Sequence, residues 1–145
     1  MSNAYRELKA RQQEEFNQFP LGAAFSNEQF KEMMEKWGLK EKDTDKIISL
    51  GAGAFIRKAD KEAFLEINRR HTAQLKEAIA ADTTGEGFVY EMFYYELANH
   101  EYGYTGDLED TLDALGYTAE EINADEKLLR GLNKAADEIM SHDCF

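Results

Sequence analysis

The chain has 145 residues and a formal net charge of −12, and 43% of its residues are hydrophobic and 12% aromatic. This length suits one domain with its own core, and the aromatic content excludes a disordered acidic tail, because such tails lack large apolar side chains. Apolar stretches are far shorter than the roughly 20 residues of a membrane-spanning helix, so we expect a cytoplasmic protein with no secretory signal and no membrane contact. The single cysteine, Cys144, permits no intramolecular disulfide.

Two amphipathic helices are predicted near the start of the chain. Residues 3–16 carry apolar side chains near one helical face, and Pro20 ends that helix. Ser26, followed three residues later by Gln29, makes a capping-box pattern that predicts the start of a second helix. Gly38 follows the last apolar residue of that helix and should end it.

A glycine-rich segment, GAGAF at residues 51–55, raises the question of phosphate binding. A dinucleotide fingerprint would need a glycine at position 56, where this chain has Ile56, and no Gly-Lys-Ser/Thr sequence follows. Arg57 and Lys58 leave open a weak anion-binding role. A tight turn, in a small hairpin near residues 47–57, is the favoured interpretation.

The second half of the chain is predicted to be helical. The most apolar segment, residues 88–98, has an apolar stripe so wide that it predicts the central helix. Gly116 should end a short helix, and Thr118 with Glu121 makes a second capping box. A last helix is expected from about residue 125 to residue 140.

The expected fold is therefore mostly α, a single compact multi-helix domain over residues 1–145 with at most one small hairpin. Its core should contain the apolar residues that recur at helical spacing. They are Phe30, Trp37, Phe64, Ile67, Phe93, Leu97, Leu112 and Leu132.

The charge is divided unevenly along the chain. Residues 1–82 contain 14 acidic and 14 basic residues, whereas residues 83–145 contain 15 acidic and three basic residues and account for the whole imbalance. No lysine or arginine occurs between Lys76 and Lys127. Solubility is the commonest reason for an acidic surface, but solubility alone would not require the charge to be confined to one half.

This partition predicts a surface that binds a basic protein. Complementary potentials speed association and favour the right partner, and nucleic acid itself is a poor partner because carboxylates repel phosphates. We expect the partner to be a nucleic-acid-binding protein, and in the extreme case the carboxylates would mimic DNA phosphates. Hard-cation binding by the same carboxylates is an alternative. The residues expected to contact the partner are Glu101, Asp107, Glu109, Asp110, Asp113, Glu120 and Glu121.

A cluster at the end of the central helix raises an enzymatic alternative. His100, with Glu96 before it and Glu101 after it, has the residue types needed for general acid–base catalysis. The zinc motif H-E-x-x-H fails because Tyr104 stands at its second histidine position. A calcium loop starting at Asp107 lacks the required glycine and glutamate, and no nucleophile motif such as G-x-S-x-G is present. We therefore favour a structural role for His100, a protein that is not an enzyme, no metal site and no cofactor; nothing in the sequence specifies the oligomeric state.

Three stretches of the chain, FPLGAAFSNEQFKEMMEKWGL, LGAGAFIRKAD and NHEYGYTGDLEDTLDALG, resemble a family of small hypothetical proteins from gut Firmicutes and their plasmids and phages. The resemblance covers residues 4 to about 138, and NHEYGYTGD is its most specific piece. It carries no assigned activity and so implies no functional residue. It implies a bacterial or mobile-element setting, in which an acidic surface would suit an inhibitor of a host nuclease or restriction system.

Overall fold

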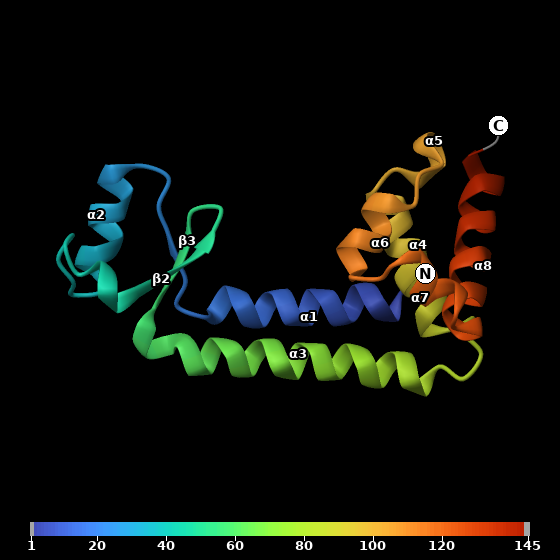
Figure 1. Cartoon of the computed structure of the whole chain (residues 1–145), viewed down its shortest axis with the longest axis horizontal. Coiled ribbons are helices and arrows are strands. Elements are labelled where there is room, and N and C mark those ends of the chain that lie inside the picture. The colour runs from blue at the N-terminus through green and yellow to red at the C-terminus, as the bar shows by residue number, and fades with distance from the viewer. Residues whose placement is uncertain (1, 144–145) are drawn as a thin grey trace. The chain divides into compact units, whose positions relative to one another are not determined.

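The computed structural model describes residues 2–143, and within this range lie eight α-helices and one small sheet (Figure 1). The mostly α fold class is thereby confirmed. Contacts divide the chain into two compact units, unit 1 with residues 1–11 and 73–145, and unit 2 with residues 12–72. The expectation that the whole chain folds as one domain stays a prediction. Cys144 lies outside the described residues.

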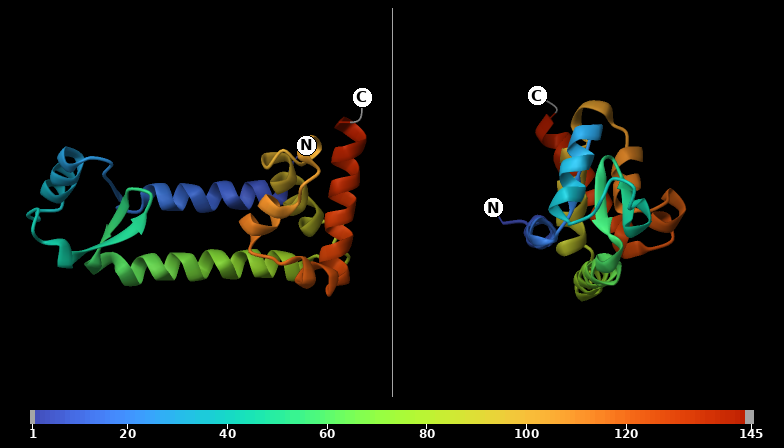
Figure 2. Two further views of the ribbon diagram at one scale, coloured as in Figure 1. Left: turned by 45° about the horizontal axis from the view of Figure 1, so that its top comes forward. Right: turned by 90° about the vertical axis from the view of Figure 1, so that its left-hand side faces the viewer.

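Unit 2 contains a three-stranded antiparallel sheet in the order β1-β3-β2. Its strands are β1 (Gly22–Ala23), β2 (Ile47–Gly51) and β3 (Ala54–Arg57), and β2 is preceded by a 3₁₀ turn, η1 (Thr44–Lys46). The predicted hairpin is therefore confirmed, and β1 adds a third strand that the sequence pattern did not indicate. Helix α2 (Asn27–Lys36) packs against β1. Figure 2 shows α2 in light blue and the hairpin of β2 and β3 in green.

The glycine-rich segment forms the turn between β2 and β3. Gly51, Ala52 and Gly53 have φ angles of 88°, 52° and 78°, a region that glycine enters freely and other residues rarely. A side chain at position 53 would also collide with Phe25, whose ring would lie 2.5 Å from the added Cβ. The segment is thus a tight turn, as the sequence favoured.

Helix α2 begins and ends where the sequence predicts. Ser26 Oγ accepts a hydrogen bond from Gln29 N at 3.2 Å. At the other end Gly38, at a φ of 70°, follows Trp37, the C-cap residue of the helix. The other half of the capping box differs from the pattern. Gln29 Oε1 accepts from Phe25 N at 2.8 Å, so the glutamine fixes the residue before the cap.

Two long helices, α1 (Ala4–Gln18) and α3 (Lys61–Ala81), contribute residues to both units. A 3₁₀ turn, η2 (Lys58–Asp60), leads into α3. Within unit 2 they are joined through Glu15. Its two carboxylate oxygens lie 2.7 Å from Nε2 of the buried His71 and 2.6 Å from Nη2 of Arg70. The hydrogen bonds from His71 and then Arg70 hold the pKa of Glu15 below its usual value.

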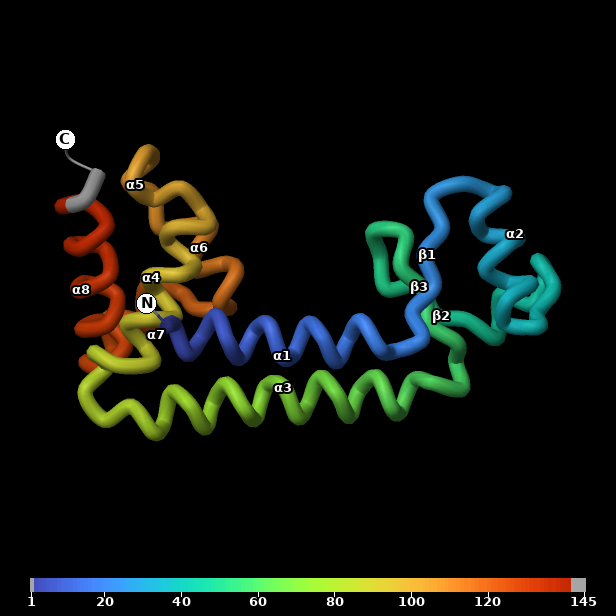
Figure 3. Tube along the Cα trace, turned by 180° about the vertical axis from the view of Figure 1, so that it is seen from behind, coloured from blue at the N-terminus to red at the C-terminus, as the bar shows by residue number. Residues whose placement is uncertain are grey.

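Unit 1 is built on α4 (Phe88–Asn99) packed against α8 (Glu126–Asp143). The short helices α5 (Tyr102–Thr105), α6 (Glu109–Leu115) and α7 (Ala119–Asn123) pack on this pair, and α4 lies between α6 and α8 (Figure 3). The central helix predicted over 88–98 is α4. No helix of residues 2–143 combines the length and the apolar character needed to cross a bilayer.

The prediction of buried residues holds for unit 1, but in unit 2 it names residues that are only half-buried. Phe93, Leu97 and Leu132 are buried, and Leu112 is half-buried against them. The unit 2 residues predicted to be buried are only half-buried, because a small unit buries a smaller share of its surface. These residues are Phe30, Trp37, Phe64 and Ile67, and the buried apolar side chains of unit 2 are instead Met33, Met34 and Ile56.

Capping residues set the boundaries of the last helices. Thr118 and Glu121 form the predicted capping box of α7, with bonds of 3.0 and 3.1 Å between their backbone and side-chain groups. Gly116, at a φ of 77°, ends α6. Asp125 Oδ1 accepts from Lys127 N at 3.0 Å and so caps the start of α8.

Candidate interaction surface and groove

The seven residues predicted to bind a partner all lie in unit 1, and all are exposed. Three lie on α6, two on α7, and two border α5. In this order they are Glu109, Asp110 and Asp113; Glu120 and Glu121; Glu101 and Asp107. We call this set the acidic surface.

The charge imbalance belongs to unit 1. That unit contains 18 acidic and seven basic residues, a net charge of −11, whereas unit 2 contains 11 acidic and 10 basic residues, a net charge of −1. The division of charge seen along the sequence therefore corresponds to a division between the two structural units.

Some acidic residues of unit 1 have structural roles, and Asp82 is the clearest case. Its carboxylate accepts backbone hydrogen bonds from Gly85, Gly87 and Val89 at 3.0, 3.1 and 2.9 Å. Burial raises the pKa of Asp82, but these backbone bonds outweigh burial and hold the pKa below its usual value. Asp82 thus orders the loop that leads into α4.

Glu96 has a structural role in the core. It is 7% exposed, and its Oε1 accepts a hydrogen bond of 2.8 Å from the hydroxyl of Tyr5. Its Oε2 lies 3.4 Å from Nε2 of His100. Burial, followed by the bond to Glu96, raises the pKa of Tyr5 well above its usual value.

The three residues of the enzymatic alternative are only partly brought together. Glu96 and His100 are adjacent, but the carboxylate of Glu101 makes no hydrogen bond or ion pair with the described side chains of residues 2–141. Glu101 instead adopts a left-handed conformation, with a φ of 58°, between His100 and the start of α5. Helix α4 ends at Asn99, with His100 as its C-terminal cap residue.

Five members of the acidic surface have no side-chain partner among the described residues: Glu101, Glu109, Asp110, Asp113 and Glu120. The other two each accept one backbone hydrogen bond, Asp107 from Glu109 N at 2.9 Å and Glu121 from Thr118 N at 3.0 Å. The surface therefore presents carboxylates that no lysine or arginine of the described chain neutralises.

Local helix stability explains part of this surface but not all of it. Glu109, Asp110 and Glu120 lie in the first turn of their helices, where the helix dipole stabilises a carboxylate. Asp113 lies in the last turn of α6, where the dipole disfavours it, and four residues after Glu109, which repels it. The position of Asp113 therefore has no stabilising explanation within the helix.

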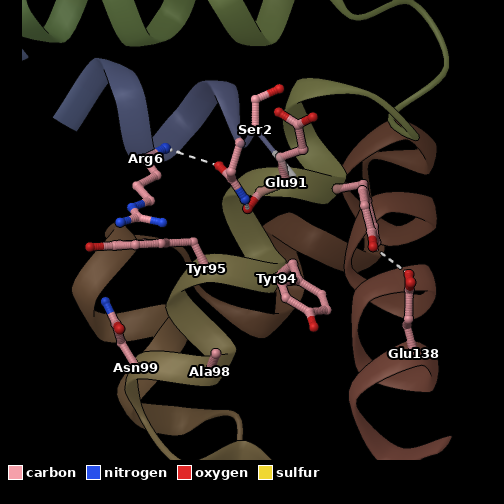
Figure 4. A pocket seen from close by; sticks show the side chains of 10 residues that line it. Ser2, Arg6, Glu91, Tyr94, Tyr95, Ala98, Asn99 and Glu138 are labelled. Atoms are coloured by element: carbon pink, nitrogen blue, oxygen red, sulfur yellow. Dashed lines mark hydrogen bonds between the residues drawn. The ribbon is translucent and has the colours of Figure 1, made fainter. Parts of the chain in front are cut away.

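The structure also contains a groove of about 370 Å³ in unit 1, beside α4 (Figure 4). Three tyrosines of α4 line it, together with carboxylates from α4 and α8 and one arginine from α1. These residues are Tyr90, Tyr94, Tyr95, Glu91, Glu138 and Arg6. Sequence reasoning missed the groove, because tyrosines at helical spacing in an apolar segment are typical of core residues.

Contacts inside the groove hold its carboxylates in place. The hydroxyl of Tyr90 donates to Glu138 (Figure 4), and burial followed by this bond raises the pKa of Tyr90 well above its usual value. Glu91 accepts a hydrogen bond of 2.7 Å from Ala4 N. Lys134, which does not line the groove, has its Nζ 4.4 Å from the centre of the Tyr90 ring, a cation–π distance.

Among the side chains that the structure describes, those of residues 2–141, no group of three or more His, Cys, Asp or Glu is placed to hold a metal ion. The fold and the site thus define a small, mostly helical protein with an acidic surface and a tyrosine-lined groove. Its sequence matches the family of unknown function DUF7659 over residues 4–138, and the chain belongs to this family. Neither the curated proteins nor the solved structures gave a match.

Proposed function

We propose that this protein is an interaction module whose acidic surface binds a basic, nucleic-acid-binding protein. The observation that carries the proposal is the set of exposed carboxylates on and around α5, α6 and α7 that have no cationic partner in the described chain. A partner's lysines and arginines would pair with them without first breaking internal ion pairs. Asp113 adds to the argument, since binding gives a reason for a carboxylate that its helix disfavours.

The distribution of charge favours long-range attraction of such a partner. Screening by salt reduces the range over which an exposed charge acts to about 8 Å at physiological ionic strength. An acidic surface therefore attracts a basic protein appreciably only when many charges lie together. Unit 1 meets this condition with a net charge of −11. Such a field speeds the encounter with a basic protein and discriminates against acidic ones.

In its most specific form, the proposed function is inhibition of a host nuclease or restriction protein by mimicry of DNA. Carboxylates fixed on short, capped helices would take the positions of phosphates in the lysine- and arginine-lined cleft of the target. The capping box of α7 and the Asp107 bond at the start of α6 support this form, because they fix those helices. A bacterial or mobile-element setting would suit such an inhibitor.

The enzymatic alternative has less support. Glu96 is buried and already accepts a hydrogen bond from Tyr5, and His100 faces it at 3.4 Å. A general acid or base must instead reach the proton of a bound substrate. A catalytic role for His100 is therefore the weaker proposal.

Capture from a bacterial lysate tests the proposed function. The immobilised protein should retain mainly basic, nucleic-acid-binding proteins, and raising the salt concentration should release them, because their contacts are screened charges. Added duplex DNA should compete for the retained proteins. Retention of proteins without a basic bias, or retention that salt does not weaken, would show that the acidic surface is only a solvated face.

A further inference from the structure

We propose that the tyrosine-lined groove of unit 1 binds an arginine side chain presented by the basic partner. This inference rests on the proposed function, because the partner supplies the arginine. It adds a second contact region, formed by α4, α8 and the start of α1, to the acidic surface on α5, α6 and α7.

The walls of the groove suit a flat cation with an apolar stem. Tyr94 and Tyr95 are half-buried, and their hydroxyls have no hydrogen-bond partner among the described side chains, those of residues 2–141. The Tyr90 and Tyr94 rings lie 5.9 Å apart, centre to centre. One turn after Tyr94, Ala98 lines the groove without a large side chain to fill it. Aromatic faces attract guanidinium groups, and tyrosine is among the rings that do so.

The carboxylates of the groove supply the matching charge. Glu138 uses one oxygen to accept from Tyr90, and Glu91 uses one oxygen to accept from Ala4 N at 2.7 Å. The second oxygen of each has no hydrogen bond in the described chain and is available to a guanidinium. Because these acids are already held by protein groups, less side-chain entropy is lost when a cation pairs with them.

The position of the single cationic side chain among the described lining residues makes the two ends of the groove electrostatically different. Arg6 lies at the end of the groove next to Tyr95, and Glu138 lies at the opposite end (Figure 4). Arg6 therefore repels an incoming cation from its own end, and the carboxylate of Glu138 attracts one. Lys134, whose Nζ lies 4.4 Å from the centre of the Tyr90 ring, offsets part of the attraction at the Glu138 end. Arg6 remains free to donate to a carbonyl oxygen of the partner's backbone.

The Tyr90 ring already contacts a cation that comes from outside the lining of the groove. Lys134 Nζ lies 4.4 Å from the centre of the Tyr90 ring, on the helix that also carries Glu138. Arginine suits the groove better than lysine, because its planar fork stacks on a ring while its N–H groups pair with a carboxylate. The volume, about 370 Å³, is near the lower end for ligand pockets and suits one side chain with its flanking backbone.

The test is a chemical-shift titration of the ¹⁵N-labelled full chain with N-acetyl-arginine amide. Its neutral isostere N-acetyl-citrulline amide and N-acetyl-lysine amide serve as comparison ligands. The arginine ligand should shift the backbone amides of Tyr94, Tyr95 and Ala98. The lysine ligand should shift them at higher concentration, and the citrulline ligand should leave them unchanged.

Two variants and a matched control complete the test. Glu138→Gln and Tyr94→Ala should each weaken arginine binding about tenfold, the effect of losing one charge-assisted or stacking contact. Glu126→Gln removes an exposed acid from the same helix, outside the groove, and should leave binding unchanged. The dispersion of the amide spectrum reports whether each variant is folded.

The outcomes separate this inference from the proposed function. If arginine shifts only amides of α6 and α7, if citrulline binds equally well, or if Glu138→Gln behaves like Glu126→Gln, the groove does not recognise arginine. The acidic surface can still capture basic proteins in any of these cases. If the groove binds the arginine ligand but the lysate yields no basic protein, the proposed function fails and the arginine site stands.

Discussion

Tyr5 on α1 and Glu96 on α4 are joined by a hydrogen bond of 2.8 Å between two buried side chains that lie 91 residues apart in the sequence. The bond ties the start of the chain to the core of unit 1. Burying a carboxylate is costly unless polar groups face it, and Glu96 has the hydroxyl of Tyr5 on one oxygen and the ring of His100 near the other.

Tyr5→Phe should therefore destabilise the protein. The change removes only the hydroxyl, leaves a buried carboxylate without its donor, and should cost about 1–3 kcal/mol of unfolding free energy. Urea denaturation followed by far-ultraviolet circular dichroism measures it. Tyr104→Phe is the control, because Tyr104 is 92% exposed and should lose no stability. Equal stability of both variants would show that the Tyr5 bond contributes nothing.

The same variant tests whether the chain is one domain. Trp37, the only tryptophan, lies in unit 2, whereas Tyr5 lies in unit 1. If the two units unfold together, Tyr5→Phe should lower the urea midpoint seen by Trp37 fluorescence as much as the midpoint seen by circular dichroism. An unchanged Trp37 transition would instead reveal two independently folding units.

His100→Gln should lower stability only modestly, by less than about 1 kcal/mol, because the pair with Glu96 is long and the side chain is 31% exposed. Elemental analysis should find the same zinc content in the variant and the parent. A transition metal coordinated by His100 in the parent would overturn the structural role and favour the enzymatic alternative.

Asp82→Asn should change how stability depends on pH. The pKa of Asp82 in the folded chain lies below its ordinary value of 3.8, so the carboxylate stabilises the fold above that value. This contribution is lost as the pH falls through the folded pKa. The variant should be less stable by about 1 kcal/mol near neutral pH and should lose less stability on acidification. Asp110→Asn, at an exposed position without a partner, should match the parent's acid profile in thermal unfolding.

Asp113→Asn should have opposite effects on stability and binding. Removing the charge ends the repulsion between Asp113 and Glu109 and the unfavourable interaction of the carboxylate with the α6 helix dipole. The change should stabilise α6 by about 0.2–0.5 kcal/mol. It should also weaken capture of the basic partner, because one unpaired carboxylate is lost. A variant that is more stable and binds as well as the parent would remove Asp113 from the proposed interface.

Features that depend on residues close together in the sequence could be predicted, whereas features that depend on contacts between distant residues could not. The caps at Ser26 and Thr118 depend on residues three positions apart, so the sequence patterns predicted them correctly. Strand β1 depends on pairing with residues about 30 positions away, and its two residues carry no pattern of their own. The left-handed Glu101, which follows α4, also has no local sequence signal.

The candidate site shows the same division. Exposure of the seven acids could be predicted, because an unpaired charge stays in water. The burial of Glu96 could not, since only the fold brings Tyr5 to it. The groove could not be predicted either, because the fold brings Arg6 and Glu138, from opposite ends of the sequence, to the tyrosines of α4.

The most direct measurement of the central claim compares two triple charge reversals in binding to a captured basic protein. One replaces Glu109, Asp110 and Asp113 of the acidic surface with lysine. The other replaces Glu14, Glu32 and Glu62, three exposed acids of unit 2, and so changes the net charge equally. The account predicts that the first variant loses binding at physiological salt and keeps its helical circular dichroism, while the second binds nearly as well as the parent. Equal binding by the two variants would contradict it.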